Sequence, residues 1–152
     1  MKFSFSYQTP VCKIWLAEED GAITELSFGP IRESEERETP LLSLAAGQLA
    51  EYFEGSRQSF DLPLKTHGTI FQQSVWVALQ DIPYGGTCSY GAIANAVGNK
   101  KASRAVGMAN NKNPIAIIIP CHRVIGSSGG LTGYGGGLDI KRALLDLERK
   151  YK

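Results

Sequence analysis

A cysteine, a histidine and an arginine follow one another at Cys121, His122 and Arg123, directly after Pro120. An imidazole or a guanidinium close to a thiol favours its ionised form, and the thiolate is the form of cysteine that acts as a nucleophile. These residues therefore predict an activated nucleophile at Cys121. An inert core thiol is an equal alternative at this point, because free cysteine is among the most buried residue types.

The residues on both sides of this cysteine are apolar and β-branched, over 117–119 before it and 124–125 after it. A continuous apolar run of this kind is typical of a fully buried, extended segment. Pro120 lacks the amide hydrogen that an inner strand needs, so an ordinary strand cannot continue through it. We therefore expect Cys121 inside the protein, where a buried extended segment ends.

The length and composition are those of a globular protein. A chain of 152 residues can bury a substantial core, in one large domain or two small ones. The first eleven residues lack the apolar centre of a signal peptide, and no apolar run is long enough to span a membrane. The three cysteines, Cys12, Cys88 and Cys121, are too far apart in sequence for a disulfide framework or a structural zinc site. We expect a cytoplasmic protein without a membrane partner, a metal or a cofactor.

The charges are distributed unevenly along the chain. Residues 1–62 contain five Lys and Arg against eleven Asp and Glu, a net charge of −6, whereas residues 63–152 contain eleven against four, a net charge of +7. No acidic residue occurs between Asp81 and Asp139. This asymmetry predicts two domains, the second of which binds a polyanion, with a solvated basic face as the alternative.

The first part of the chain reads as a small α/β support domain over residues 1–62. Alternating polar and apolar residues predict a strand at 2–8, and two more strands at 11–17 and 23–28 complete an antiparallel meander. The acidic residues 33–38 are expected to form a solvated loop.

A helix should follow this loop, because Thr39 and Pro40 are typical of a helix start and Gly55 of a helix end. Residues 63–68 are the expected connector to a second domain over 69–152.

The second domain is expected to begin with a helix over 69–80. A further helix over 90–97, a turn containing glycine and a helix over 101–111 then have the spacing of a helix-turn-helix. Many structural helix pairs share this spacing. Small residues in the second helix of the pair would let it approach a nucleic acid backbone closely, with Lys100, Lys101 and Arg104 supplying positive charge.

A glycine-rich segment and a final helix complete the chain. Seven glycines fall within residues 126–137, which is typical of a flexible linker or of a loop whose backbone approaches a ligand closely. The helix predicted over 138–150 places Glu148 at the flank of an apolar stripe. This stripe comprises Ile140, Ala143, Leu144 and Leu147.

The motif Pro-Cys-His-Arg-Val at 120–124 resembles that of the methylated-DNA–protein-cysteine methyltransferases, also called O6-alkylguanine-DNA alkyltransferases. The likeness extends from about Phe71 to Glu148. It includes Ser89-Tyr90, residues 103–107, Asn113-Pro114, residues 133–136 and Leu144-Leu145. The resemblance implies an α/β ribonuclease-H-like domain over 1–62 and a mostly α winged helix-turn-helix domain over 69–152.

The resemblance also implies roles for single residues. Cys121 accepts the alkyl group, His122 takes the thiol proton through a water molecule, and Glu148 holds the imidazole. Asn113 braces the active-site segment, and Tyr90 donates a proton to the departing guanine.

Further roles concern DNA and the flipped base. Arg104 fills the space that a flipped-out base leaves in the duplex. Other DNA contacts are implied for Ser89, Tyr90, Lys100, Lys101, Ala105 and Gly107. The base pocket is formed by Ala116, Val124, Tyr134 and Gly135.

These roles describe a DNA repair protein that acts once. A thioether has no easy leaving group, so a monomer that takes the alkyl group of O6-alkylguanine from double-stranded DNA onto Cys121 is consumed, and no cofactor is needed. O4-alkylthymine is left open as a second substrate. Three alternatives are a damage-binding protein without transfer activity, a helix-turn-helix regulator and a Cys-His hydrolase.

Overall fold

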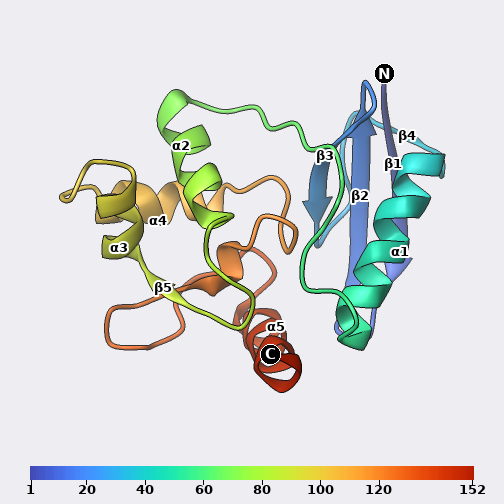
Figure 1. The fold of residues 1–152 in the computed structure, drawn as a ribbon. Coiled ribbons are helices and arrows are strands. Elements are labelled where there is room, and N and C mark those ends of the chain that lie inside the picture. The colour runs from blue at the N-terminus through green and yellow to red at the C-terminus, as the bar shows by residue number, and fades with distance from the viewer. The chain divides into compact units, whose positions relative to one another are not determined.

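The computed structural model describes residues 1–152, and the chain divides into two compact units, Met1–Thr66 and His67–Lys152. This division falls inside the segment 63–68 that the sequence suggests as a connector. In Figure 1 the first unit is the sheet with helix α1, and the second contains helices α2 to α5. The first unit is α/β and the second is mostly helical, as predicted.

A four-stranded sheet in the order β3-β2-β1-β4 forms the first unit. Strands β1 (Lys2–Gln8), β2 (Lys13–Glu19) and β3 (Ala22–Ser27) are antiparallel neighbours, which confirms the predicted meander. Asp20 and Gly21 connect β2 to β3 in the left-handed conformation, with φ of 53° and 78°. Such angles suit a tight hairpin turn.

The acidic segment 33–38, expected to be a loop, contains a fourth strand, β4 (Glu35–Glu36). It pairs in parallel with β1, and Arg37 N donates to Ser4 O at 2.9 Å just beyond it. The expectation of a loop is therefore wrong for these two residues. Two residues are too few to show an alternating pattern, and charged side chains are common on edge strands, where they discourage pairing with other chains.

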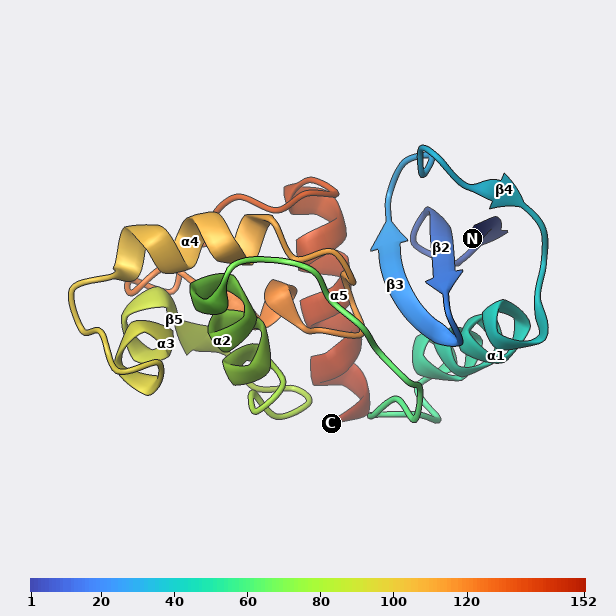
Figure 2. The same cartoon turned by 90° about the horizontal axis from the view of Figure 1, so that it is seen from above.

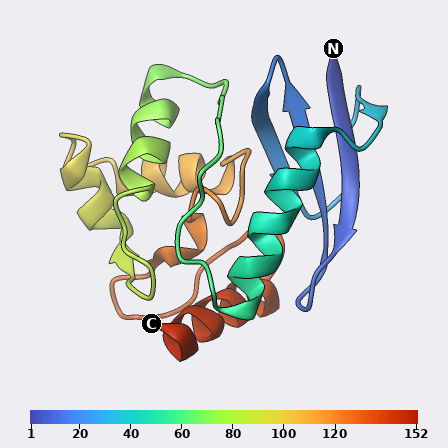
Figure 3. The same cartoon turned by 45° about the vertical axis from the view of Figure 1, so that its right-hand side comes forward.

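Helix α1 (Pro40–Glu54) has the bounds that its end signals predict. The side chain of Thr39 accepts a hydrogen bond from Leu42 N at 3.1 Å, which satisfies a free amide of the first turn. Gly55 ends the helix with φ of 86°, a conformation that glycine adopts without strain. The buried face of α1 packs against β1, β2 and β3, across which the helix lies in Figure 3.

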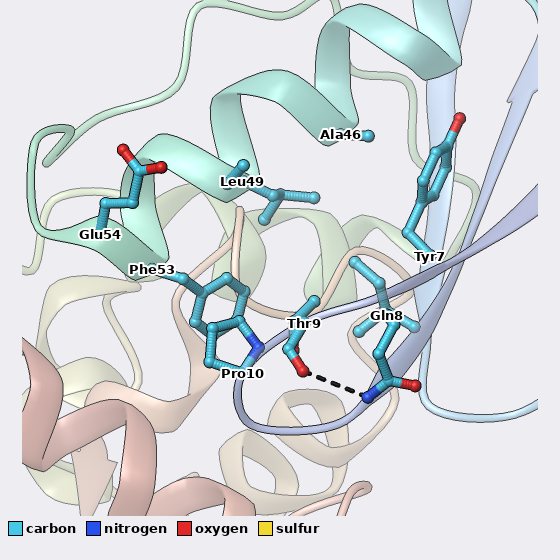
Figure 4. A pocket seen from close by; sticks show the side chains of 10 residues that line it. Tyr7, Gln8, Thr9, Pro10, Ala46, Leu49, Phe53 and Glu54 are labelled. Atoms are coloured by element: carbon cyan, nitrogen blue, oxygen red, sulfur yellow. Dashed lines mark hydrogen bonds between the residues drawn. The ribbon is translucent and has the colours of Figure 1, made fainter.

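A pocket of about 310 Å³ lies between α1 and the turn that joins β1 to β2 (Figure 4). Pro10, Leu49 and Phe53 give it mostly apolar walls, and Tyr7 and Glu54 add polar groups. None of the residues that the sequence marks for chemistry lines this pocket.

Four helices make up most of the second unit: α2 (Ile70–Leu79), α3 (Tyr90–Ala96), α4 (Ser103–Asn111) and α5 (Leu138–Tyr151). Helices α2, α3 and α4 contact one another, and Figure 2 shows them as one group. Two short strands, β5 (Cys88–Ser89) and β6 (Val124–Ile125), pair in parallel beside them. None of the helices combines the length and the apolar composition that crossing a bilayer requires.

Helices α3 and α4 are the predicted helix pair. The Ser89 side chain caps α3, as expected. Helix α4 begins at Ser103, two residues later than predicted, because the turn before it is longer. On its buried side, α4 is tied to α2 by Trp76, whose Nε1 donates to Ala109 O at 2.9 Å.

Helix α5 begins where predicted and ends one residue later, but its buried face differs from the expected apolar stripe. That face comprises Lys141, Leu144, Leu145 and Glu148. Ile140, Ala143 and Leu147, which the pattern assigns to the core, are only half-buried. The helix therefore turns two charged residues, seven positions apart, toward the interior.

Substitution by alanine should change the free energy of unfolding in opposite directions at two glycines of the first unit. Gly55→Ala places a side chain at φ of 86° and should lower the free energy of unfolding by about 1–2 kcal/mol. Gly47→Ala lies on the exposed side of α1, where an added Cβ meets no atom within 4 Å, and should raise it by about 0.5–1 kcal/mol. Urea denaturation of both variants measures the two changes, and equal signs would contradict this account of α1.

Candidate active site

The residues before Cys121 form tight turns. Ile118 N donates to Ala116 O, and Cys121 N to Ile119 O, each at 2.8 Å. Both bonds join residue i to residue i−2, the pattern of a γ-turn, and Pro120 has the matching φ of −80° and ψ of 63°. Residues 117–119 are buried as predicted, but the extended geometry expected for them is wrong, because an apolar run indicates burial without fixing the backbone conformation. The extended geometry expected after Cys121 is confirmed by β6.

Asn113 braces these turns from both sides. Its Nδ2 donates to Ile119 O at 2.8 Å, and its Oδ1 accepts from Ile115 N at 3.0 Å. Between these two residues Ile117 has φ of 69°, which is strained for a β-branched side chain. Such strain costs about 1–3 kcal/mol and persists only where the surroundings fix the backbone, as these two bonds do.

Cys121 and His122 then follow each other in a short 3₁₀ helix, η1 (Cys121–Arg123). Both residues are buried.

Glu148 of α5 holds the two residues that follow the thiol. Its carboxylate accepts from His122 Nε2 at 2.6 Å, from Arg123 Nε at 2.8 Å and from Arg123 Nη2 at 3.1 Å. The backbone amide of Gly85 donates to it at 3.2 Å. Glu148 and His122 are fully buried, so these contacts replace the water that both side chains lose.

The contact with Glu148 also decides the tautomer of His122. Because a carboxylate only accepts hydrogen bonds, Nε2 carries the proton, and Nδ1 is left as a base. Nδ1 is buried and has no hydrogen-bond partner within the protein. Burial lowers the pKa of His122, and this effect outweighs the pairing with Glu148, which raises it. A neutral imidazole with a free Nδ1 can accept a proton from a neighbour.

The surroundings of Cys121 shift the pKa of its thiol in opposite directions. Burial raises its pKa, while a hydrogen bond from Asn113, the charge of Lys141 and a hydrogen bond from Tyr134 lower it. The groups that favour the thiolate come from three separate segments. The site is therefore built so that positive charge and hydrogen-bond donors converge on the sulfur atom.

Two contributors to this site are missed by the sequence analysis. Lys141 is fully buried, and its Nζ donates to Val124 O at 2.7 Å and to Thr132 O at 2.9 Å. Asn110, which the helix pattern treats as a small residue, is buried and donates from Nδ2 to Cys121 O at 3.3 Å. The spacing of seven residues between Lys141 and Glu148, two helical turns, is the one sequence signal for the lysine.

Tyr90 stands at the first position of α3, half-buried. Its hydroxyl group shares a short hydrogen bond with the hydroxyl group of Thr132. A Cβ atom added to Gly107 of α4 would meet the Tyr90 ring at 3.7 Å, an ordinary van der Waals contact, so α4 passes close to this ring.

The residues expected to form a base pocket lie in different settings. Ala116 and Val124 are buried before and after Cys121 in the sequence, and the Tyr134 hydroxyl group lowers the pKa of the Cys121 thiol through a hydrogen bond. Gly135 is exposed, in open space. Two of the four residues are therefore fixed in the core, and the other two belong to the glycine-rich segment.

The residues expected to contact DNA share an exposed surface. Lys100, Lys101, Arg104 and Ala105 are all exposed on the turn and the first part of α4. No carboxylate in the ion pairs of this unit neutralises Arg104 or either lysine. The surface is thus basic and open, and Ser89 and Gly107 are half-buried beside it.

Two family models match most of the chain. Residues 70–150 match the model described as the DNA binding domain of 6-O-methylguanine DNA methyltransferase, and residues 3–66 match its ribonuclease-like domain. A constitutive methylated-DNA–protein-cysteine methyltransferase of Bacillus subtilis is 46% identical over 159 residues, which cover 98% of this chain and 96% of the relative. One from Methanosarcina acetivorans is 64% identical over 104 residues, 68% of this chain and 67% of the relative.

Solved structures agree with these matches. The crystal structure of the Mycobacterium tuberculosis O6-methylguanine methyltransferase has a TM-score of 0.91 at 45% identity, covering 100% of this chain and 95% of that one. The Mycobacterium tuberculosis protein OGT in complex with DNA has a TM-score of 0.93 at 48% identity, covering 98% and 94%.

The contribution of Lys141 to the thiol can be measured directly. Lys141→Met removes a positive charge near Cys121 and should raise the pKa of the thiol further. The pH profile of Cys121 labelling by iodoacetamide should therefore move to higher pH. Lys150→Met, an exposed lysine of the same helix, is the matched control, and Cys12 and Cys88 are internal references. An unshifted profile in the folded variant would contradict this role of Lys141.

Proposed function

The chain belongs to the 6-O-methylguanine DNA methyltransferase family, and from this premise we propose that it repairs O6-alkylguanine in DNA by moving the alkyl group onto its own Cys121. The observation that carries this proposal is the order of groups around η1. A buried thiol is followed by a neutral imidazole, which a buried carboxylate holds with its base nitrogen free.

The transfer is a displacement at an sp³ carbon. The proton of Cys121 passes through a water molecule to His122 Nδ1, and the sulfur forms a bond to the alkyl carbon as the bond from that carbon to guanine O6 breaks. Tyr90 donates its hydroxyl proton to the leaving guanine, which avoids release of a purine anion. Asn113, Lys141 and the Tyr134 hydroxyl group favour the thiolate in this step.

A guanine in a duplex cannot present its O6 substituent to a buried sulfur atom, so the base must leave the stack at a cost of a few kcal/mol. Arg104, exposed on α4, is the side chain that we assign to the vacated space. Lys100 and Lys101 then contact phosphates, which position a protein without reading sequence. The crystallised complex of the Mycobacterium tuberculosis relative with DNA supports DNA as the partner.

Two further properties follow from this chemistry. The thioether cannot be removed by any group of the proposed mechanism, so each molecule acts once, as a monomer and without a cofactor. Three unpaired cysteines, one of which must stay reduced to react, fit the reducing cytoplasm.

A duplex with one O6-methylguanine tests the proposal. The peptide that contains Cys121 should gain the mass of one methylene group, in a yield of no more than one per protein molecule, and the lesion should disappear in equal amount. Cys121→Ala should bind the duplex and leave the lesion intact. An intact lesion with the unchanged protein would favour a damage-binding protein, and repeated turnover on an ester or amide would favour a hydrolase.

Arg104 should affect the rate of methyl transfer only on duplex DNA, where the base has to be flipped. Arg104→Ala should slow methyl transfer from a duplex by about tenfold or more, because flipping costs a few kcal/mol and each 1.4 kcal/mol corresponds to tenfold. Transfer from the same lesion in single-stranded DNA should change much less. Arg142→Ala, which removes an equal charge from exposed α5, is the control. Equal slowing on both substrates would refute the assigned role of Arg104.

A further inference from the structure

Thr132 joins three parts of the candidate site, although neither the motif nor the resemblance assigns it a role. Its hydroxyl group is hydrogen-bonded to the hydroxyl group of Tyr90, 42 positions away in the sequence. Its backbone carbonyl accepts from Lys141 Nζ at 2.9 Å. The glycine-rich segment 126–137 is therefore anchored in its middle, at the one residue that touches both a candidate proton donor and a buried cation.

Lys141 links Thr132 to the residue that follows η1. The ammonium group that holds its carbonyl also donates to Val124 O at 2.7 Å, directly after η1. A buried lysine needs such partners to compensate the loss of water, so moving Thr132 away would leave the Lys141 charge incompletely satisfied. The position of Thr132 is thus coupled to the turn that carries the acceptor thiol.

The backbone and the ring of Tyr90 are held in place by neighbouring segments. Ser89, the residue before it, pairs with Ile125 in the β5–β6 ladder, and the Tyr90 ring lies against Gly107 of α4. With the ring fixed, the remaining freedom of the hydroxyl group is rotation about its C–O bond. In the pair with Thr132 either hydroxyl group can be the donor.

We infer that Thr132 is a positioning residue for Tyr90 in the transfer reaction, an inference that rests on the proposed function. When a guanine is bound, Tyr90 directs its proton to the base, and Thr132 turns to donate its own proton in a hydrogen bond to the Tyr90 oxygen. That bond stabilises the negative charge that develops on the phenol as its proton leaves.

The protons balance in this scheme. The Tyr90 proton ends on the released guanine, and the Cys121 proton ends on His122. Because Thr132 is exposed, solvent next to it can return a proton to the Tyr90 oxygen, while His122 releases its extra proton to solvent. The net change is thiol plus alkylguanine to thioether plus guanine, with no other reactant.

Two substitutions separate the hydroxyl group from the shape of the side chain. Thr132→Val keeps the branched shape and loses the hydroxyl group, and it should slow single-turnover methyl transfer by about tenfold, the size expected for one hydrogen bond to a developing charge. Thr132→Ser should keep a rate close to that of the unchanged protein. In a Tyr90→Phe background, Thr132→Val should cause no further loss, because its partner is absent.

A second electrophile distinguishes this role from a merely structural one. Iodoacetamide reacts with Cys121 and releases iodide, which needs no proton, so Thr132→Val should leave that rate unchanged. Slowing with both reagents, failure of Thr132→Ser to retain activity, or additive losses with Tyr90→Phe would overturn the inference. If the unchanged protein transfers no methyl group, the proposed function itself fails, whereas an active Thr132→Val at the full rate refutes only the role of Thr132.

Discussion

The second unit depends on one buried carboxylate, that of Glu148. Its two oxygens accept four hydrogen bonds, from His122, from two nitrogens of Arg123 and from the amide of Gly85. This number fills the acceptor positions of a carboxylate. A charge removed from water costs several kcal/mol unless such partners compensate it, so the fold around Glu148 must be complete for the charge to be tolerated. The same contacts leave His122 Nδ1 as the base.

Helix α5 brings a negative and a positive side chain to η1 and to the residue after it. Glu148 contacts His122 and Arg123 of η1. Lys141, two helical turns earlier in α5, donates a hydrogen bond to the carbonyl of Val124, the residue that follows η1. Both side chains leave the helix on one face, whose other members are apolar. A rigid helix fixes the spacing of these charges more firmly than a loop could. The segment that leads into η1 is strained at Ile117. The charges around η1 are therefore supplied by a neighbouring helix and not by this segment.

The features that the sequence predicts well are those with local signals. Cap residues give the bounds of α1, and the apolar residues around Cys121 give its burial. The role of Cys121 as a nucleophile stays a prediction. The turns before Cys121 are not predicted, because the same apolar run fits any buried backbone. Lys141 is missed because helix patterns assign charged residues to solvent. The bond between Tyr90 and Thr132 joins residues 42 positions apart, so no local pattern contains it.

The charges around Cys121 offset part of the effect that burial has on its thiol. Lys141 and Arg123 carry two positive charges and Glu148 one negative charge, while His122 is kept neutral by burial. The buried cluster is thus one positive charge in excess when Cys121 is a thiol, and the thiolate neutralises it. Burial opposes ionisation, but the alternative to ionisation is an unbalanced cation in the core, which is also costly. The positive charge and the hydrogen bonds therefore offset part of the effect of burial, which still leaves the pKa of the Cys121 thiol above its ordinary value.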